Sequence, residues 1–140
     1  AWVAHTGSLD WPPVLLYLAG IAWTLFYDTI YAHQDTEDDA LIGIKSTARL
    51  FAENSPRWLR NFLMATVMLM ALAVLLALLP NENPLQLVLA LAAPWAMGWH
   101  LAWQLIRFDA NDTKTLTRIF RSNRDAGLIP VLFFALCLVV

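Results

Sequence analysis

Long uncharged hydrophobic runs alternate with short charged segments along the chain. Three runs of 17, 21 and 24 residues carry no charge, at positions 11–27, 61–81 and 83–106. A hydrocarbon core of roughly 30 Å requires about 20 apolar residues in a helix, so these runs predict membrane-spanning helices. A last run, 126–140, holds 15 residues. As a helix it covers about 22 Å, which stops short of a full crossing.

This pattern predicts an all-α fold, a polytopic transmembrane helix bundle of about four helices that forms a single membrane domain over residues 1–140. The spans are expected at about 11–30, 58–79, 84–107 and 125–140, joined by loops at 31–57 and 108–124. Pro-Asn-Glu-Asn-Pro at 80–84 predicts a tight hairpin. For the first and last runs the alternative is a buried helix of a soluble protein.

Composition agrees with a membrane protein, because 59% of the residues are hydrophobic and only 14% are charged. The net charge of −2 argues against a nucleic-acid partner. A single cysteine, Cys137, excludes a disulfide within the chain, and its apolar surroundings favour a small buried side chain.

The nine Lys and Arg residues all fall within two segments, 45–60 and 107–124, and none lies in 1–10 or 80–84. Four antiparallel spans place both basic segments on one side of the membrane. The positive-inside bias makes that side the cytoplasm, or the matrix in a mitochondrion.

Tryptophans recur at every fourth position of the third run, at Trp95, Trp99 and Trp103, with His100 beside them. This spacing favours a packing or lipid-facing ridge. His100 is expected to be a hydrogen-bonded helix residue, although a polar group inside a span leaves a functional role open.

Five of the eleven acidic residues lie within 28–39. If the first helix continues past the membrane boundary, Asp28, Asp35 and Asp39 share one face, with Asp38 at its margin. Neighbouring carboxylates repel one another, which predicts a bound cation. Mg²⁺ is the natural candidate, because it prefers oxygen ligands and is usually held by one or two carboxylates together with substrate phosphates.

The tract that follows, 42–49, supplies two hydroxyl groups and the cations Lys45 and Arg49. Such side chains suit anionic oxygens, so a substrate that is half diphosphate and half hydrocarbon fits this membrane edge. The tract lacks the P-loop pattern, and the acidic cluster lacks EF-hand spacing. The alternative is a solvated acidic loop.

The pattern Asp28-x-x-Tyr31-Ala32-x-x-Asp35-x-x-Asp38-Asp39, followed by Ile42-Gly43-Ile44-Lys45-Ser46-Thr47, resembles the second aspartate-rich motif of UbiA-type intramembrane prenyltransferases. The pattern is closest to members that act on 4-hydroxybenzoate in ubiquinone biosynthesis. The resemblance implies a nine-helix bundle with two aspartate-rich motifs facing each other across a central cavity. The first motif is absent from this sequence, so we expect the chain to be the C-terminal half of such an enzyme and its partner to be the N-terminal half.

The resemblance also implies the chemistry, which is transfer of a polyprenyl group from polyprenyl diphosphate to the ring of 4-hydroxybenzoate. It assigns catalytic roles to Asp28, Asp35 and Asp39, Mg²⁺ binding to these three and Asp38, and substrate binding to Tyr31, Lys45 and Arg49. It implies an integral protein of the bacterial or mitochondrial inner membrane, with these residues facing the cytoplasm or matrix. Because only one acidic cluster is present, we expect the 140-residue chain alone to be inactive.

Two alternatives stay open. The same superfamily can use another aromatic acceptor, such as haem, chlorophyllide or a naphthoate ring, although Tyr31 with Asp35 favours hydroxybenzoate. A cation-binding transporter subunit is the other alternative. It is disfavoured because transporters place acidic residues near the bilayer midplane, whereas these lie at the end of a span.

Overall fold

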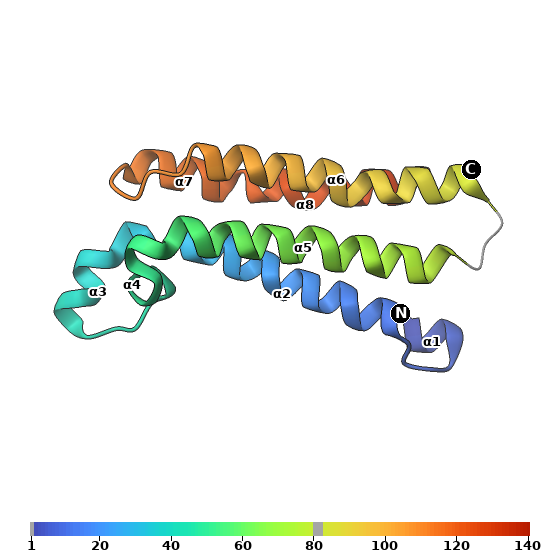
Figure 1. Ribbon diagram of the computed structural model, residues 1–140, viewed down its shortest axis with the longest axis horizontal. Coiled ribbons are helices and arrows are strands. Elements are labelled where there is room, and N and C mark those ends of the chain that lie inside the picture. The colour runs from blue at the N-terminus through green and yellow to red at the C-terminus, as the bar shows by residue number, and fades with distance from the viewer. Residues whose placement is uncertain (1, 80–82) are drawn as a thin grey trace.

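The computed structural model describes residues 2–79 and 83–140, apart from the side chains of Glu37 and Asp38, and its regular structure is helical (Figure 1). Positions 80–82 of the predicted hairpin lie outside the described residues. The elements are α1 (Trp2–Thr6), α2 (Trp11–Ala32), η1 (His33–Asp35), α3 (Thr36–Ile42), α4 (Thr47–Phe51), η2 (Ala52–Asn54), α5 (Ser55–Leu78), α6 (Pro84–Ile106), α7 (Thr113–Arg121) and α8 (Asn123–Leu136).

Three helical stretches are long and apolar enough to cross a membrane, at Trp11–Asp35, Thr47–Leu78 and Pro84–Ile106. The all-α membrane fold is therefore confirmed. The fourth predicted span is helical as α8, but its 14 residues are fewer than a crossing requires.

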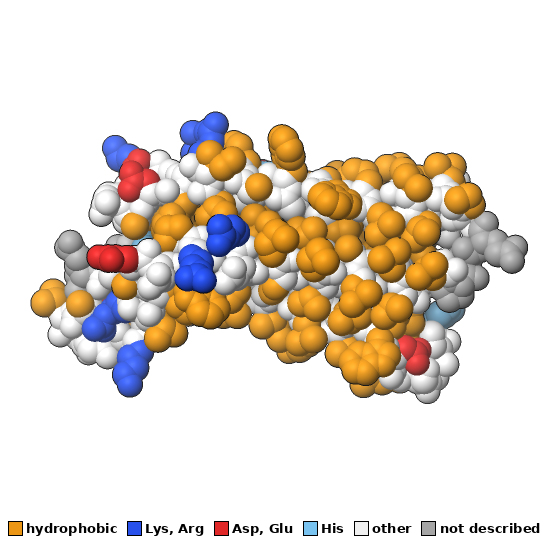
Figure 2. Space-filling view, viewed as in Figure 1, with side chains coloured by type: hydrophobic (Ala, Val, Ile, Leu, Met, Phe, Trp, Pro, Cys, Tyr) orange, Lys and Arg blue, Asp and Glu red, His pale blue; other side chains and the backbone are white. Residues whose placement is uncertain are grey.

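The long helices pack in the order α2, α5, α6, α8, and α7 folds back onto α2 (Figure 1). Helices α3, α4 and α7 lie at one end of the bundle, and α1 lies at the other. Lys and Arg side chains gather at the α3, α4 and α7 end, while hydrophobic side chains cover the middle of the visible face (Figure 2). The two basic segments therefore meet at the same end of the bundle.

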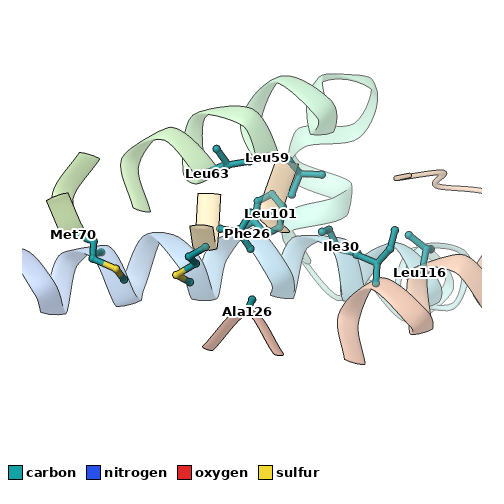
Figure 3. Packing of buried hydrophobic residues seen from close by; sticks show 11 residues of the cluster. Phe26, Ile30, Leu59, Leu63, Met70, Leu101, Leu116 and Ala126 are labelled. Atoms are coloured by element: carbon teal, nitrogen blue, oxygen red, sulfur yellow. The ribbon is translucent and has the colours of Figure 1, made fainter. Parts of the chain in front are cut away.

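The core lies between α2, α5 and α6, and α7 and α8 close it from the side (Figure 3). Phe26 and Ile30 of α2, Leu59 of α5 and Leu101 of α6 are fully buried. In lipid, helix association depends on close van der Waals packing, because the surrounding tails are as apolar as the side chains. Gly98 of α6 permits such packing, since a Cβ there would lie 2.6 Å from a methyl carbon of Val67.

The segments predicted as connecting loops contain short helices. Asp112 caps the N-terminus of helix α7, and its carboxylate accepts hydrogen bonds from the backbone N–H of Lys114 and Thr115 and from the Thr115 hydroxyl group. The Thr115 hydroxyl, at 2.6 Å, is the main reason why the pKa of Asp112 lies below its usual value. This cap gives the basic segment 113–121 a helical conformation that a loop would lack.

The tryptophan ridge faces outward, with Trp95 72% and Trp99 82% exposed. His100 lies with Nε2 3.2 Å from the Ser122 carbonyl oxygen, so it joins α6 to the α7–α8 junction. The ridge is therefore a surface feature of α6 and His100 is a hydrogen-bonded helix residue, as the spacing favoured. Cys137 is buried, as predicted.

Candidate functional site

The predicted carboxylates lie at the end of the bundle where α2 gives way to α3. Asp28 is exposed in the last turns of α2, Asp35 is exposed in η1, and Asp39 is half-buried in α3. A shared face for all three required the helix to continue from Asp28 to Asp39, and this condition is not met, because η1 interrupts the helix and shifts the register between the two residues.

Side-chain hydrogen bonds to the backbone explain the interruption. The Thr36 hydroxyl lies 3.2 Å from both the Ala32 and His33 carbonyl oxygens, and Nδ1 of His33 lies 2.7 Å from the Thr29 carbonyl oxygen. Such local bonds compete with the regular helical ladder and tighten the turn. The 3₁₀ turn redirects the chain into α3.

Among the side chains that the structure describes, no three acidic, histidine or cysteine residues lie close enough together to hold a metal ion. The side chain of Asp38, the fourth predicted ligand, lies outside the described residues. The magnesium assignment therefore stays a prediction, carried by the oxygen donors of Asp28, Asp35 and Asp39.

The turn after α3 positions Lys45 and Arg49, the two residues predicted to bind the diphosphate. Gly43 ends α3 in the left-handed conformation, with φ +78°. Arg49 of α4 donates to the Asp39 carbonyl oxygen at 2.9 Å and also to the Ile44 carbonyl oxygen, while Lys45 is exposed. These hydrogen bonds stabilise the turn and keep the guanidinium group of Arg49 beside the backbone of Asp39.

The same turn is fastened to α2 by a buried hydroxyl pair. The Thr29 hydroxyl donates to the Thr47 hydroxyl at 3.1 Å, and the Thr29 side chain is fully buried. The basic turn therefore cannot move away from the end of α2 without breaking this hydrogen bond.

Tyr31, the third predicted substrate ligand, packs on α7. Its ring centroid lies 4.7 Å from that of Phe120, and the residue remains 44% exposed. This contact joins the acidic end of α2 to the basic segment 113–121. The ring is therefore positioned by packing and still accessible from outside.

A large apolar cavity of about 1100 Å³ runs beside α2 toward this end of the bundle. Its walls come from α1, α2, α5, α6 and α8, and its polar side chains on α2 include Thr24 and Tyr27. Tyr27 is the last residue of α2 in the cavity wall, and the acidic cluster begins with the next residue, Asp28, which does not line the cavity. The sequence interpretation did not single out Trp23 or Tyr27, although they lie eight and four residues before Tyr31 on one helix face.

Residues 1–124 match the family model described as "UbiA prenyltransferase family". The chain is 46% identical over 130 residues to a Mus musculus protein named "4-hydroxybenzoate polyprenyltransferase, mitochondrial", covering 91% of this chain and 33% of that protein. Proteins of the same name match in Homo sapiens, at 45% identity with 94% and 34% covered, and in Dictyostelium discoideum, at 43% with 98% and 27% covered.

The chain spans about a third of the length of these curated relatives. No solved structure matches the chain significantly.

Proposed function

The chain belongs to the UbiA prenyltransferase family, and from this premise we propose that the full-length protein transfers a polyprenyl group from polyprenyl diphosphate to 4-hydroxybenzoate. The names of the relatives support this substrate pair. The word "mitochondrial" in these names and the three candidate spans support a mitochondrial membrane, and we propose the inner membrane, or the corresponding bacterial membrane, as the location. The basic end of the bundle then faces the matrix or the cytoplasm.

The reaction exchanges one bond for another. The bond between the allylic carbon and the diphosphate oxygen breaks, and its electron pair leaves with the diphosphate. A ring carbon ortho to the phenol hydroxyl forms the new carbon–carbon bond and then loses its proton. Catalysis therefore requires stabilisation of negative charge on the leaving group and exclusion of water from the allylic cation.

The residues at the end of α2 suit the leaving group. Asp28, Asp35 and Asp39 would hold Mg²⁺, with Asp38 as an auxiliary ligand, because carboxylate oxygens are its preferred donors and substrate phosphates complete its shell. When bound, the ion would neutralise charge on the diphosphate.

The basic turn and the apolar cavity supply the other requirements. Lys45 and Arg49 would direct cationic groups at the diphosphate, and Tyr31 would line the approach to the acidic cluster. The cavity of about 1100 Å³ would receive the hydrocarbon and keep water from the cation.

One observation carries this proposal. The family's aspartate motif begins in the last turns of α2, the helix that forms a wall of the large apolar cavity, so a hydrocarbon tail beside α2 and a diphosphate head at its end would lie along neighbouring parts of the chain. An amphiphilic prenyl diphosphate has this same division between charge and hydrocarbon.

A membrane assay of the full-length protein tests the proposal. Radiolabelled 4-hydroxybenzoate and a polyprenyl diphosphate are supplied with Mg²⁺ or with EDTA, and label entering the lipid phase is counted. We expect Mg²⁺-dependent product, and near-complete loss of turnover in Asp35→Asn and Asp39→Asn. Asp109→Asn is the matched control, because Asp109 is an acidic residue outside the motif, in the segment between α6 and α7.

The outcomes separate the alternatives. Absence of product, with diphosphate still protecting segment 28–39 from proteolysis, would retain the family and point to another aromatic acceptor. Absence of both product and protection would contradict the proposal and favour a cation transporter. Unchanged turnover in both aspartate variants would remove these residues from the site.

A further inference from the structure

A buried polar side chain of α6 contacts the junction between α7 and α8. Gln104 is fully buried near the end of α6, and its Nε2 donates to Oγ of Ser122 at 2.9 Å. One turn earlier on the same helix, Nε2 of His100 lies 3.2 Å from the Ser122 carbonyl oxygen. Two side chains of α6 therefore contact the one residue at which α7 ends and α8 begins.

The contribution of the Gln104 amide to stability does not explain its presence in the core. Within the described ranges 2–79 and 83–140, its Oε1 atom is buried without a hydrogen-bond partner. A buried acceptor without a partner destabilises a fold, and polar groups are costly inside a membrane span. The Ser122 hydroxyl donates to the Ile119 carbonyl oxygen at 2.7 Å, so it does not need the amide as an acceptor. A methionine would fill the same space without an unpaired oxygen, so packing does not account for the amide.

The same junction carries the contact between α7 and the acidic end of α2. Nδ2 of Asn123 donates to the Phe120 carbonyl oxygen at 3.2 Å, and the Phe120 ring lies 4.7 Å from the Tyr31 ring between centroids. The Phe120 ring also meets Tyr27 edge-on at 5.9 Å. A shift of Ser122 along α6 would therefore move Phe120 and change the packing that orients the Tyr31 ring.

Apolar packing holds α7 against the bundle but does not fix its register. Leu116 and Ile119 of α7 are buried in the same core cluster as Ile30 of α2 (Figure 3). Burial of aliphatic side chains is non-directional, so small rotations and slides of α7 change its free energy little. Hydrogen bonds are directional, so the contacts from α6 select one position of the junction.

We propose that Gln104 is a positioning residue for the prenyl transfer. By fixing Ser122, it keeps Phe120 against the Tyr31 ring, beside the aspartate motif. This inference rests on the proposed function, in which Tyr31 lines the approach to the acidic cluster. Misplacement of a substrate-contacting group by about 1 Å can lower turnover by about 100-fold, so a buried amide can act on the reaction from a distance.

Hydrogen exchange and steady-state kinetics of the full-length protein in detergent micelles test the inference. Gln104→Met removes the amide and keeps a side chain of similar volume. We expect it to speed amide exchange over residues 117–124 and to lower kcat about tenfold or more, with both KM values within about twofold of the wild type. Its denaturation midpoint should stay at or above the wild-type value, because the unpaired acceptor is gone.

Thr66→Val is the matched control for loss of a buried polar group. Thr66 is fully buried in α5, and its hydroxyl donates to the Phe62 carbonyl oxygen of the same helix at 2.8 Å. This hydrogen bond does not join α5 to the junction. Thr66→Val should therefore leave both kcat and amide exchange over residues 117–124 unchanged.

A double-substitution cycle tests whether Gln104 acts through Ser122. Ser122→Ala removes the oxygen that accepts from the amide, whereas Ser122→Thr keeps a hydroxyl group. Gln104→Met should lower kcat much less in the Ser122→Ala background than in the wild type, because the contact is already lost there. Ser122→Thr should keep most of the wild-type turnover.

Three results would overturn the inference. They are unchanged amide exchange over residues 117–124 in Gln104→Met, additive losses of kcat in the double variant, and a fall in kcat that follows a lowered denaturation midpoint. The proposed function fails in a different way. A wild-type protein that forms no product, in which Gln104→Met still speeds exchange over residues 117–124, would contradict that function and retain the contact between α6 and the junction.

Discussion

Replacement of Gly127 by alanine would perturb the contact between α8 and Trp23. A Cβ at this position would lie 2.7 Å from Cη2 of Trp23 and 3.5 Å from Cζ2. Ordinary carbon contacts lie at about 3.5–4.0 Å, so the indole edge would have to move by about 0.8 Å. That movement is opposed by the hydrogen bond from Nε1 of Trp23 to Asn123 and by the edge contact with Tyr27.

The expected change in stability is a difference between two opposing effects. Alanine stabilises a helix interior by about 1 kcal/mol relative to glycine. Overpacking of a tight contact costs roughly 1–3 kcal/mol, and weakening of the indole hydrogen bond adds to this. We therefore expect Gly127→Ala to lower the free energy of unfolding by about 1 kcal/mol.

Gly20→Ala provides the matched control. Gly20 lies inside α2, and a Cβ there would meet no atom within 4 Å. Only the helix effect remains, so this variant should raise the free energy of unfolding by about 1 kcal/mol. The two substitutions are chemically identical and should have opposite signs.

The assay is denaturation of the full-length protein in detergent micelles, with each substitution also made in a Trp23→Phe background. The smaller ring removes the atoms that the new methyl group would meet, so Gly127→Ala should become stabilising there. Equal stabilisation by Gly127→Ala and Gly20→Ala in the wild-type background would refute the reasoning.

Three further substitutions test separate parts of the fold. Gly43→Ala should cost about 1 kcal/mol, because φ +78° is unfavourable for a side chain, and should speed proteolysis of the turn after α3. Phe26→Ala should cost about 3 kcal/mol in detergent denaturation, while Leu25→Ala, at the 36% exposed neighbour, should cost much less. The hydrogen bonds of the cap on α7 lower the pKa of Asp112, so the cap stabilises α7 above about pH 4 and is lost as the pH falls through the pKa of the folded state. Amide exchange in α7 should show this loss of protection at low pH. Asp112→Ala should abolish the pH dependence of that protection.

Features that depend on local composition and spacing could be predicted from the amino-acid sequence. Uncharged run length predicted the three long helices, because the thickness of a hydrocarbon core sets the number of apolar residues. The clustering of Lys and Arg predicted that both basic segments lie at one end, and the aspartate pattern pointed to the family that the chain matches. These properties can be read within a window of one helix.

The contacts between α2 and the α7–α8 junction became visible only in the folded chain. Trp23 and Asn123 are a hundred positions apart, and their hydrogen bond exists because α7 and α8 return to the end of α2. The 3₁₀ turn η1 after α2 could not be predicted from the sequence pattern either. A 3.6-residue period assumes a regular helix, and the hydrogen bonds of the Thr36 hydroxyl change the helix geometry locally. Contacts between distant segments depend on how helices pack, and packing is a property of all of them together.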